Sequence, residues 1–315
     1  MTSKPDPNDG LEEQAAPPSA ISDAFRGLSE KSIADIYIGV EIPKSLFHYT
    51  SSQGLIGILG EHKIWFSDAT FMNDGSETTW GINLVAMAID ELLSGKPLEE
   101  IEAGESLKAE VVQAMQAFQP VIFCMSARNN LLNQWRDYGK DAVPYSIEFD
   151  VQALEKWDGK TFPIFITKIV YDVSLQRRLI RELLSRIYAK TIELRGSRQY
   201  FDEDEGQRLL RGAAVEIVSL ITRFKNTAFD AEEEWRAICY RPQVASVPRK
   251  YRSSSLGVVP YYEWYAKEAP KQLPVKSVTV GPSPYAPVSD LALQQFLADN
   301  GYDVSTHHST IPIRR

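Results

Sequence analysis

Hydrophobic and polar positions divide the chain into a polar N-terminal segment and a longer segment with regular apolar spacing. Residues 1–43 are rich in Pro, Asp, Glu, Ser and Ala and show little periodic hydrophobicity. A segment of this composition buries too little apolar surface to offset the entropy that ordering costs. The pattern therefore predicts an acidic, proline-rich, disordered tail over residues 1–43 and a single folded domain over residues 44–315.

The domain begins with a short run of strand formers at residues 45–49. Ser51 and Ser52 then offer an N-cap, and apolar residues at helical spacing continue to Leu59. A second strand-like run covers residues 63–67. The spacing therefore predicts a strand, a helix and a strand at the start of the domain.

The remaining elements follow from the same periodicities. Further strands are expected at residues 121–126, 145–149, 163–171, 234–240, 256–265 and 275–280. Helices are expected at residues 78–94, 107–118, 174–195, 206–225 and 288–299, with a short helix that contains residues 133–138. Because strands and helices are mixed without regular alternation, their order favours an α+β fold with a mixed or antiparallel central sheet and flanking helices.

Composition and charge narrow the class of protein. The chain is 43% hydrophobic and 24% charged, which is ordinary for a globular protein. Its longest apolar stretches, such as residues 120–125, are far shorter than the roughly 20 residues that span a bilayer. The only two cysteines, Cys124 and Cys239, form no disulfide framework. We expect a cytoplasmic protein without a membrane partner, and the net charge of −8 disfavours a long nucleic acid as a general partner.

Several common catalytic motifs are missing from the sequence. There is no glycine-rich phosphate loop and no Gly-x-Ser-x-Gly elbow. His48 and His62 are isolated, and no pair of cysteines or histidines stands at zinc-ligand spacing, so we expect no metal cofactor. Cys124, between Phe123 and Met125, fits a buried strand better than a nucleophile.

Four short segments carry polar and aromatic residues that a simple core does not require, namely residues 47–50, 73–77, 135–139 and 229–236. They are accompanied by Gly-Leu-x-x-Ile-Leu at residues 54–59, Trp-Phe-Ser at 65–67 and Ser-x-Ile-Pro-x-Arg at 309–314. In this order the motifs resemble a family of bacterial proteins known as domain of unknown function 2971. The resemblance covers about residues 45–315, and that family has no assigned function.

The opening strand, helix and aromatic-serine strand also resemble the start of the ADP-ribosyltransferase fold. In that fold a first-strand histidine or arginine orients the NAD ribose, an aromatic side chain stacks on nicotinamide, and a late-strand glutamate completes the site. The resemblance implies the first role for His48 and the last for Glu234, with Glu232 two residues before it. Because residues two apart on a strand share a face, we expect both carboxylates to point into one cleft, where their proximity raises one pKa.

The chemistry of NAD cleavage explains these residue types. Breaking the nicotinamide–ribose bond passes through an oxocarbenium-like species, which a nearby carboxylate stabilises. A neutral imidazole fixes a ribose hydroxyl without adding charge, and a flat aromatic ring gives nicotinamide a stacking surface. The resemblance makes NAD the expected co-substrate and a nucleotide-like small molecule the expected partner.

Eight further residues are candidates for holding NAD. They are Tyr49, Thr50, Ser67, Asn73, Trp135, Arg136, Tyr138 and Arg236. Arg136 and Arg236 are the candidates for the pyrophosphate, because a guanidinium binds such a group through two hydrogen bonds. The aromatic ring that stacks on nicotinamide is not unique, since Tyr49, Phe71, Trp135 and Tyr138 are all eligible.

Each candidate also has a purely structural interpretation. His48 would be a core histidine bonded to backbone, and the acidic run at residues 232–234 a solvated surface. Three functions are therefore open. The chain is an enzyme that cleaves NAD and transfers ADP-ribose to a protein or nucleic-acid acceptor, a non-catalytic nucleotide- or protein-binding module, or an enzyme that acts on phosphorylated RNA ends.

Overall fold

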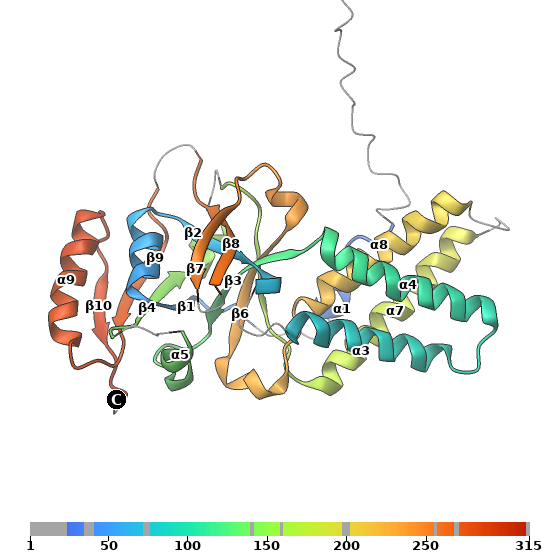
Figure 1. Cartoon of the computed structure of the whole chain (residues 1–315), viewed down its shortest axis with the longest axis horizontal. Helices are drawn as coiled ribbons and strands as arrows, with labels where there is room; N and C mark the ends of the chain where they lie inside the picture. The colour runs from blue at the N-terminus through green and yellow to red at the C-terminus, as the bar shows by residue number, and fades with distance from the viewer. Residues whose placement is uncertain are drawn as a thin grey trace, which may run out of the picture.

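Ten strands of the chain form one sheet, and most of the long helices gather beside it (Figure 1). This computed structural model describes residues 24–34, 41–71, 76–138, 142–157, 160–196, 202–254, 257–267 and 271–312. The α+β class predicted from the sequence is confirmed. None of the helices within these segments is long and apolar enough to cross a membrane.

The sheet is antiparallel except at one edge, where β10 pairs with β9 in parallel. Its strands are β1 (Ser45–Thr50), β2 (Ile64–Asp68), β3 (Pro120–Ser126), β4 (Tyr145–Asp150), β5 (Phe165–Lys168), β6 (Glu234–Tyr240), β7 (Lys250–Ser254), β8 (Gly257–Trp264), β9 (Val275–Val280) and β10 (Ser305–His308). The strands follow the order β10-β9-β4-β1-β3-β2-β8-β7, and β6 pairs with both β3 and β5. Neither β7 nor β10 was expected from the sequence pattern.

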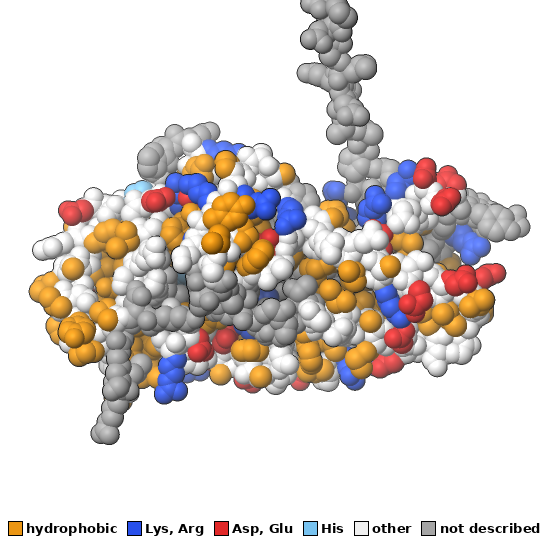
Figure 2. Space-filling model, viewed as in Figure 1, with side chains coloured by type: hydrophobic (Ala, Val, Ile, Leu, Met, Phe, Trp, Pro, Cys, Tyr) orange, Lys and Arg blue, Asp and Glu red, His pale blue; other side chains and the backbone are white. Residues whose placement is uncertain are grey.

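The helices fall into two groups. They are α1 (Leu28–Ala34), α2 (Ser52–Leu55), α3 (Ser76–Leu93), α4 (Leu98–Ala117), α5 (Leu132–Asp137), α6 (Val151–Glu155), α7 (Val173–Arg195), α8 (Glu203–Ile221) and α9 (Ala286–Asp299). Helices α1, α3, α4, α7 and α8 form a helical bundle to the right of the sheet in Figure 1, and α9 covers the opposite end. Acidic and basic side chains are interspersed over this bundle in the view of Figure 2.

Each group has its own hydrophobic core. One core joins the sheet to α2, α6 and α9 and includes Leu46, Phe66 and Phe149. The other fills the helical bundle and includes Leu179, Ile217 and other residues of α7 and α8. Apolar residues at helical spacing face inward on these helices, which is why the sequence pattern identified them.

Strand β3 is the branch point of the sheet. One of its edges pairs with β6 from Pro120 to Ser126. The other edge is shared, because β1 pairs only at Ser126 while β2 pairs at Ile122 and Val121. In the described residues, no strand pairs with Phe123, Cys124 or Met125 on that edge. The backbone groups exposed by such a gap need other partners.

Part of the predicted tail is packed structure. Phe25 and Ile33 are 1% and 5% exposed and belong to the core of the helical bundle. The carboxylate of Glu216 accepts hydrogen bonds from the backbone of Gly27 at 3.0 Å and from the backbone and hydroxyl of Ser29 at 2.8 and 2.7 Å. The packed chain therefore includes residues 24–34, upstream of the boundary predicted at residue 44. Residues 1–23 and 35–40 lie outside the described segments.

The packing of Phe25 predicts a measurable loss of stability on truncation. Phe25→Ala should lower the free energy of unfolding by roughly 3–5 kcal/mol, the usual cost of emptying a buried phenylalanine site. Tyr188→Ala is the matched control, because Tyr188 lies on the same bundle but is 62% exposed. Chemical denaturation of both variants measures the difference. Equal stability of Phe25→Ala and wild type would place Phe25 outside the core.

Candidate functional site

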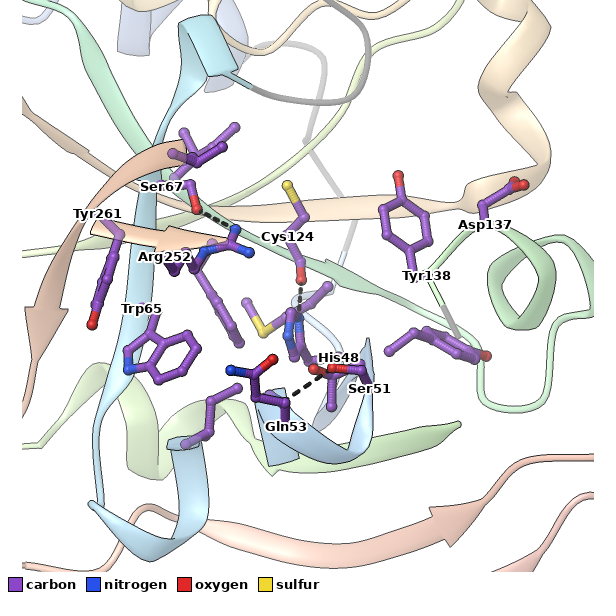
Figure 3. A pocket seen from close by; sticks show the side chains of 18 of the residues that line it. His48, Ser51, Gln53, Trp65, Ser67, Cys124, Asp137, Tyr138, Arg252 and Tyr261 are labelled. Atoms are coloured by element: carbon purple, nitrogen blue, oxygen red, sulfur yellow. Dashed lines mark hydrogen bonds between the residues drawn. The ribbon is translucent and has the colours of Figure 1, made fainter. Parts of the chain in front are cut away.

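A pocket of about 710 Å³ lies at the branch point of β3 (Figure 3). Its walls come from β1, β2, β3, β7 and β8, from α2 and α5, and from the residues around the start of β6. A volume of this size is typical of sites for small-molecule ligands. The site therefore occupies the place where β1 and β2 separate.

The structure brings most of the candidate residues together. Those that line the pocket are His48, Tyr49, Thr50, Ser67, Tyr138, Glu232 and Glu234. Trp135 is instead packed in the interior, where its ring meets Tyr49 edge-on at 4.7 Å. Arg136 is exposed, and Asn73 lies outside the described residues.

The side chain of His48, on β1, gives a hydrogen-bond partner to a backbone carbonyl of β3 that faces the gap in the sheet. His48 Nδ1 donates a hydrogen bond of 2.8 Å to the carbonyl oxygen of Cys124. Burial lowers the pKa of His48 to about 4, and the hydrogen bond to Cys124 offsets only part of this effect. The imidazole is therefore neutral at pH 7, with its proton on Nδ1. Its Nε2 then carries a lone pair that can accept a hydrogen bond.

Two carboxylates meet the pocket at the start of β6. Glu232 ends the 3₁₀ turn η3 (Thr227–Glu232), and Glu233 follows in a left-handed conformation with φ of 46°. Lys225 Nζ donates to Glu232 Oε2 at 2.7 Å and to Glu234 Oε2 at 2.9 Å. The expected convergence of both carboxylates therefore occurs. The expected strand geometry was wrong, because Glu232 precedes the strand and a shared lysine joins the pair.

Arg236 serves Glu234 rather than a ligand. Its Nε and Nη2 atoms donate to Glu234 Oε1 and Oε2 at 2.6 and 3.2 Å, and its Nη1 donates to the carbonyl oxygen of Thr222 at 3.0 Å. Burial by itself would raise the pKa of Glu234, but Arg236 and Lys225 outweigh it and lower that pKa. Glu234 is therefore not the carboxylate of the pair whose pKa is raised.

The position of Lys225 depends on where α8 ends. The sequence pattern extended this helix to residue 225, but it ends at Ile221. The chain then runs beside Val170, whose N–H donates to the carbonyl of Arg223 at 2.8 Å and whose carbonyl accepts from Lys225 N at 3.2 Å. This short parallel pairing fixes the backbone of Lys225, and its ammonium lies 5.0 Å from the ring centre of Phe229.

Cys124 faces the carboxylates as a thiol. Burial raises the pKa of Cys124, and the charge of nearby Glu234 raises it further. Since the thiolate is the nucleophilic form, this environment makes Cys124 unreactive. The hydroxyl of Tyr171 accepts a hydrogen bond of 3.0 Å from Glu234 N and so helps to fix the start of β6.

Sequence reasoning missed the cation that lines the pocket. Arg252, on β7, lines it from the side of β2, and its Nη2 donates to Ser67 Oγ at 2.9 Å. Two aromatic rings lie nearby, those of Trp65 and Tyr261, with centres 5.1 Å apart. The only local signal was a short polar run before residue 256, which does not alternate clearly enough to predict a strand.

Comparison with known proteins gives a match to one family model, which covers about a third of the chain. The protein is an α+β protein with a ligand-sized pocket at the branch of its sheet. The family model described as "Protein of unknown function (DUF2971)" matches residues 134–237, which include most of α5, Lys225 and the start of β6. This match confirms the family resemblance predicted from the motifs. Searches of curated proteins and of solved structures gave no match.

A metal centre finds no support in the described part of the chain. There, no group of three or more His, Cys, Asp or Glu side chains is arranged to hold an ion. The pocket itself presents carboxylates, an imidazole and a guanidinium.

The shared lysine predicts a large effect on stability. Lys225→Met removes the cation between two buried carboxylates, and breaking such a cluster typically costs about 3–5 kcal/mol. The deficit should shrink as the pH is lowered, because a proton can then replace the ammonium group. Lys190→Met is the control, because Lys190 pairs with the exposed Glu193 on the surface of α7. Unfolding in denaturant at two pH values measures both effects; a cost below 1 kcal/mol at pH 7 would contradict the prediction.

The lowered pKa of His48 predicts that the stability of the fold depends on pH. The folded pKa of His48, about 4, lies below the roughly 6.5 of an unfolded chain. Between these values the unfolded chain binds the proton more tightly, so this contribution to stability should fall as the pH drops from 6.5 to 4. In NMR titration, the ring signal that His48→Gln removes should keep its neutral chemical shift down to about pH 5. A midpoint near 6.5 would contradict the burial argument.

Proposed function

We propose that the pocket binds NAD, cleaves its nicotinamide–ribose bond and transfers ADP-ribose to an acceptor. One observation carries this proposal. A neutral imidazole, His48, and a carboxylate held in its charged form, Glu234, line the same pocket. In glycosidic cleavage a carboxylate near the ribose stabilises the developing positive charge, and a neutral imidazole can hold a ribose hydroxyl without adding charge.

In this proposal His48 binds the substrate before reaction. Its Nε2 accepts a hydrogen bond from a ribose hydroxyl, while the bond from Nδ1 to Cys124 O fixes the ring and its tautomer. The lowered pKa keeps the ring neutral, so it adds no charge that would repel the developing cation. The histidine thus orients the sugar without opposing the reaction.

Glu234 acts in the transition state. When the bond between C1′ and the nicotinamide nitrogen breaks, its electron pair leaves with nicotinamide, which becomes neutral. The positive charge then spreads over C1′ and the ring oxygen of the ribose, where the carboxylate stabilises it. An acceptor hydroxyl forms the new bond to C1′ and gives its proton to Glu232.

Lys225 and Arg236 hold the two carboxylates from outside the pocket lining. Lys225 and Arg236 contact the carboxylates, yet neither lines the pocket, whereas Glu232 and Glu234 do. The ion pairs therefore hold both carboxylates in place and leave negative charge facing the ligand. Preorganised charge of this kind costs little reorganisation during the reaction.

A second candidate function has an observation in its favour. Both carboxylate oxygens of Glu234 are already engaged, Oε1 by Arg236 and Oε2 by Lys225 and Arg236. Such engagement reduces the field that the carboxylate can direct at a sugar. On this basis the alternative is a non-catalytic module that binds a nucleotide in the same pocket.

Substitution of Glu234 separates the two functions. Glu234→Gln removes the charge and nearly preserves the shape, so nicotinamide release from NAD should fall by a factor of about 10²–10³. The affinity for NAD should change much less, because the developing charge exists mainly in the transition state. Release is measured by chromatography with and without cell lysate as the source of acceptor, and affinity by calorimetry.

Glu233→Gln is the matched control for this experiment. Glu233 is adjacent in sequence, is not among the pocket residues, and pairs with the exposed Arg128. It should leave nicotinamide release unchanged. Wild-type protein that binds NAD without releasing nicotinamide under any acceptor condition would favour the binding module, and absence of NAD binding would remove NAD from the proposal.

A further inference from the structure

One guanidinium in the pocket lacks the carboxylate partner that Arg223 and Arg236, the arginines in the described residues that are almost fully buried, both have. Arg252 is partly buried, and its Nε has no hydrogen-bond partner. Within the described part of the chain, its only hydrogen bond is the one that it donates to the neutral hydroxyl of Ser67. No carboxylate of the described residues pairs with it.

Three other arginines that contact the interior do have carboxylate partners. Arg236 pairs with Glu234, Arg223 with Glu30, and Arg241 with Asp68. Each of these cations is matched by an anion of the protein itself, as burial of charge ordinarily requires. None of the three lines the pocket, whereas Arg252 does.

The environment of Arg252 is costly for the free protein. Burial lowers its pKa, and no carboxylate counters this effect. An arginine nevertheless stays charged at neutral pH, so the cation persists in a poorly hydrated position. An anion that entered the pocket would recover the interaction that the protein leaves unmade, and a phosphate oxygen pair matches the planar guanidinium geometry.

We infer that Arg252, oriented by Ser67, binds the diphosphate group of a dinucleotide in this pocket. This inference rests on the proposed function for the choice of ligand. Figure 3 supports the order of the groups: Arg252 and Ser67 lie on one side of His48, and Tyr138 lies on the other. A ligand that places its diphosphate at Arg252 therefore presents the adjoining ribose to His48.

A phosphate could also come from the end of an RNA chain. The net charge of the protein, −8, opposes the approach of a polyanion, since affinity for nucleic acid rests largely on neutralising phosphates. The pocket also places the rings of Trp65 and Tyr261 close to Arg252. One diphosphate and one flat base fit this arrangement better than a long phosphate backbone.

Binding of three probes tests the assignment without any turnover. Calorimetry measures the affinity of the full-length protein for ADP-ribose, for inorganic pyrophosphate and for a short oligoribonucleotide with a terminal phosphate. Arg252→Gln should weaken the binding of ADP-ribose and of pyrophosphate roughly 10–100-fold, which is the scale of a lost pair of charged hydrogen bonds. The affinity of Arg252→Lys should fall between those of the wild type and Arg252→Gln, because lysine keeps the charge and loses the paired donors.

Two further measurements exclude a merely structural role. Arg178→Gln, on the exposed part of α7, removes the same charge elsewhere and should leave all three affinities unchanged. Arg252→Gln should keep the wild-type thermal midpoint or raise it, because it removes an unbalanced charge. If Arg252→Gln does not fold, the Arg252→Lys variant gives the affinity comparison.

The outcomes are distinct. Equal affinity of wild type and Arg252→Gln for ADP-ribose would overturn the inference, as would failure of wild type to bind either ADP-ribose or pyrophosphate. Arg252-dependent binding of the oligoribonucleotide alone would overturn the dinucleotide assignment. Arg252-dependent binding of ADP-ribose supports the subsite even if NAD is not cleaved, so the proposed catalysis can fail independently.

Discussion

The fold depends on the fact that a strand has only two edges. Strand β3 gives one complete edge to β6 and divides the other between β1 and β2. The two dividing strands must separate, and the backbone of Cys124 between them needs a partner that is not a strand. The imidazole of His48 meets this need through its bond to Cys124 O. The branching of the sheet at β3 thus accounts both for the pocket and for the position of the His48 side chain in it.

The same strand brings the two ends of the site together. The edge that pairs with β6 matches Ser126 with Glu234, and the other edge matches Ser126 with Phe47, the residue before His48. Ser126 of β3 is therefore aligned with both of the strands that carry the candidate groups. Because hydrogen-bonded strands lie about 5 Å apart, the register alone brings His48 and Glu234 to the same region of the sheet. No loop has to be positioned for the pair to form.

Local periodicity in the sequence was enough for most of the fold. Strands β1, β2, β3, β4, β6, β8 and β9 and the long helices were predicted because their apolar residues repeat at strand or helix spacing. Helix α1 was missed because its buried residues are Ser29, Ser32 and Ile33, and a single fully buried apolar side chain cannot produce a period. Its main polar contact is with Glu216, almost 190 residues away in the chain. Contacts at such separation leave no mark on a local pattern.

Only part of the candidate site could be predicted from the sequence. His48 and Glu234 could be proposed because each stands in a motif of its own strand. Lys225 and Arg252 could not, since the first depends on where α8 stops and the second on β7, a short strand with one exposed side. Arg136 and Arg236 were predicted to bind the pyrophosphate because a guanidinium can hold such a group through two hydrogen bonds. What decides the matter is the presence of a carboxylate partner, which only tertiary structure reveals.

The distribution of charge in the pocket bears on which ligand fits it. Carboxylates line one region, with their cations placed behind them, and an arginine without a carboxylate lines another. A ligand with charge of a single sign would meet repulsion at one of the two regions. NAD carries a positive nicotinamide ring and a negative diphosphate, so each end would meet the opposite charge. Complementarity of this kind fixes orientation more than affinity, because the reversed pose places like charges together. The same arrangement would bring the ribose to His48, which lies between Arg252 and Tyr138 in Figure 3.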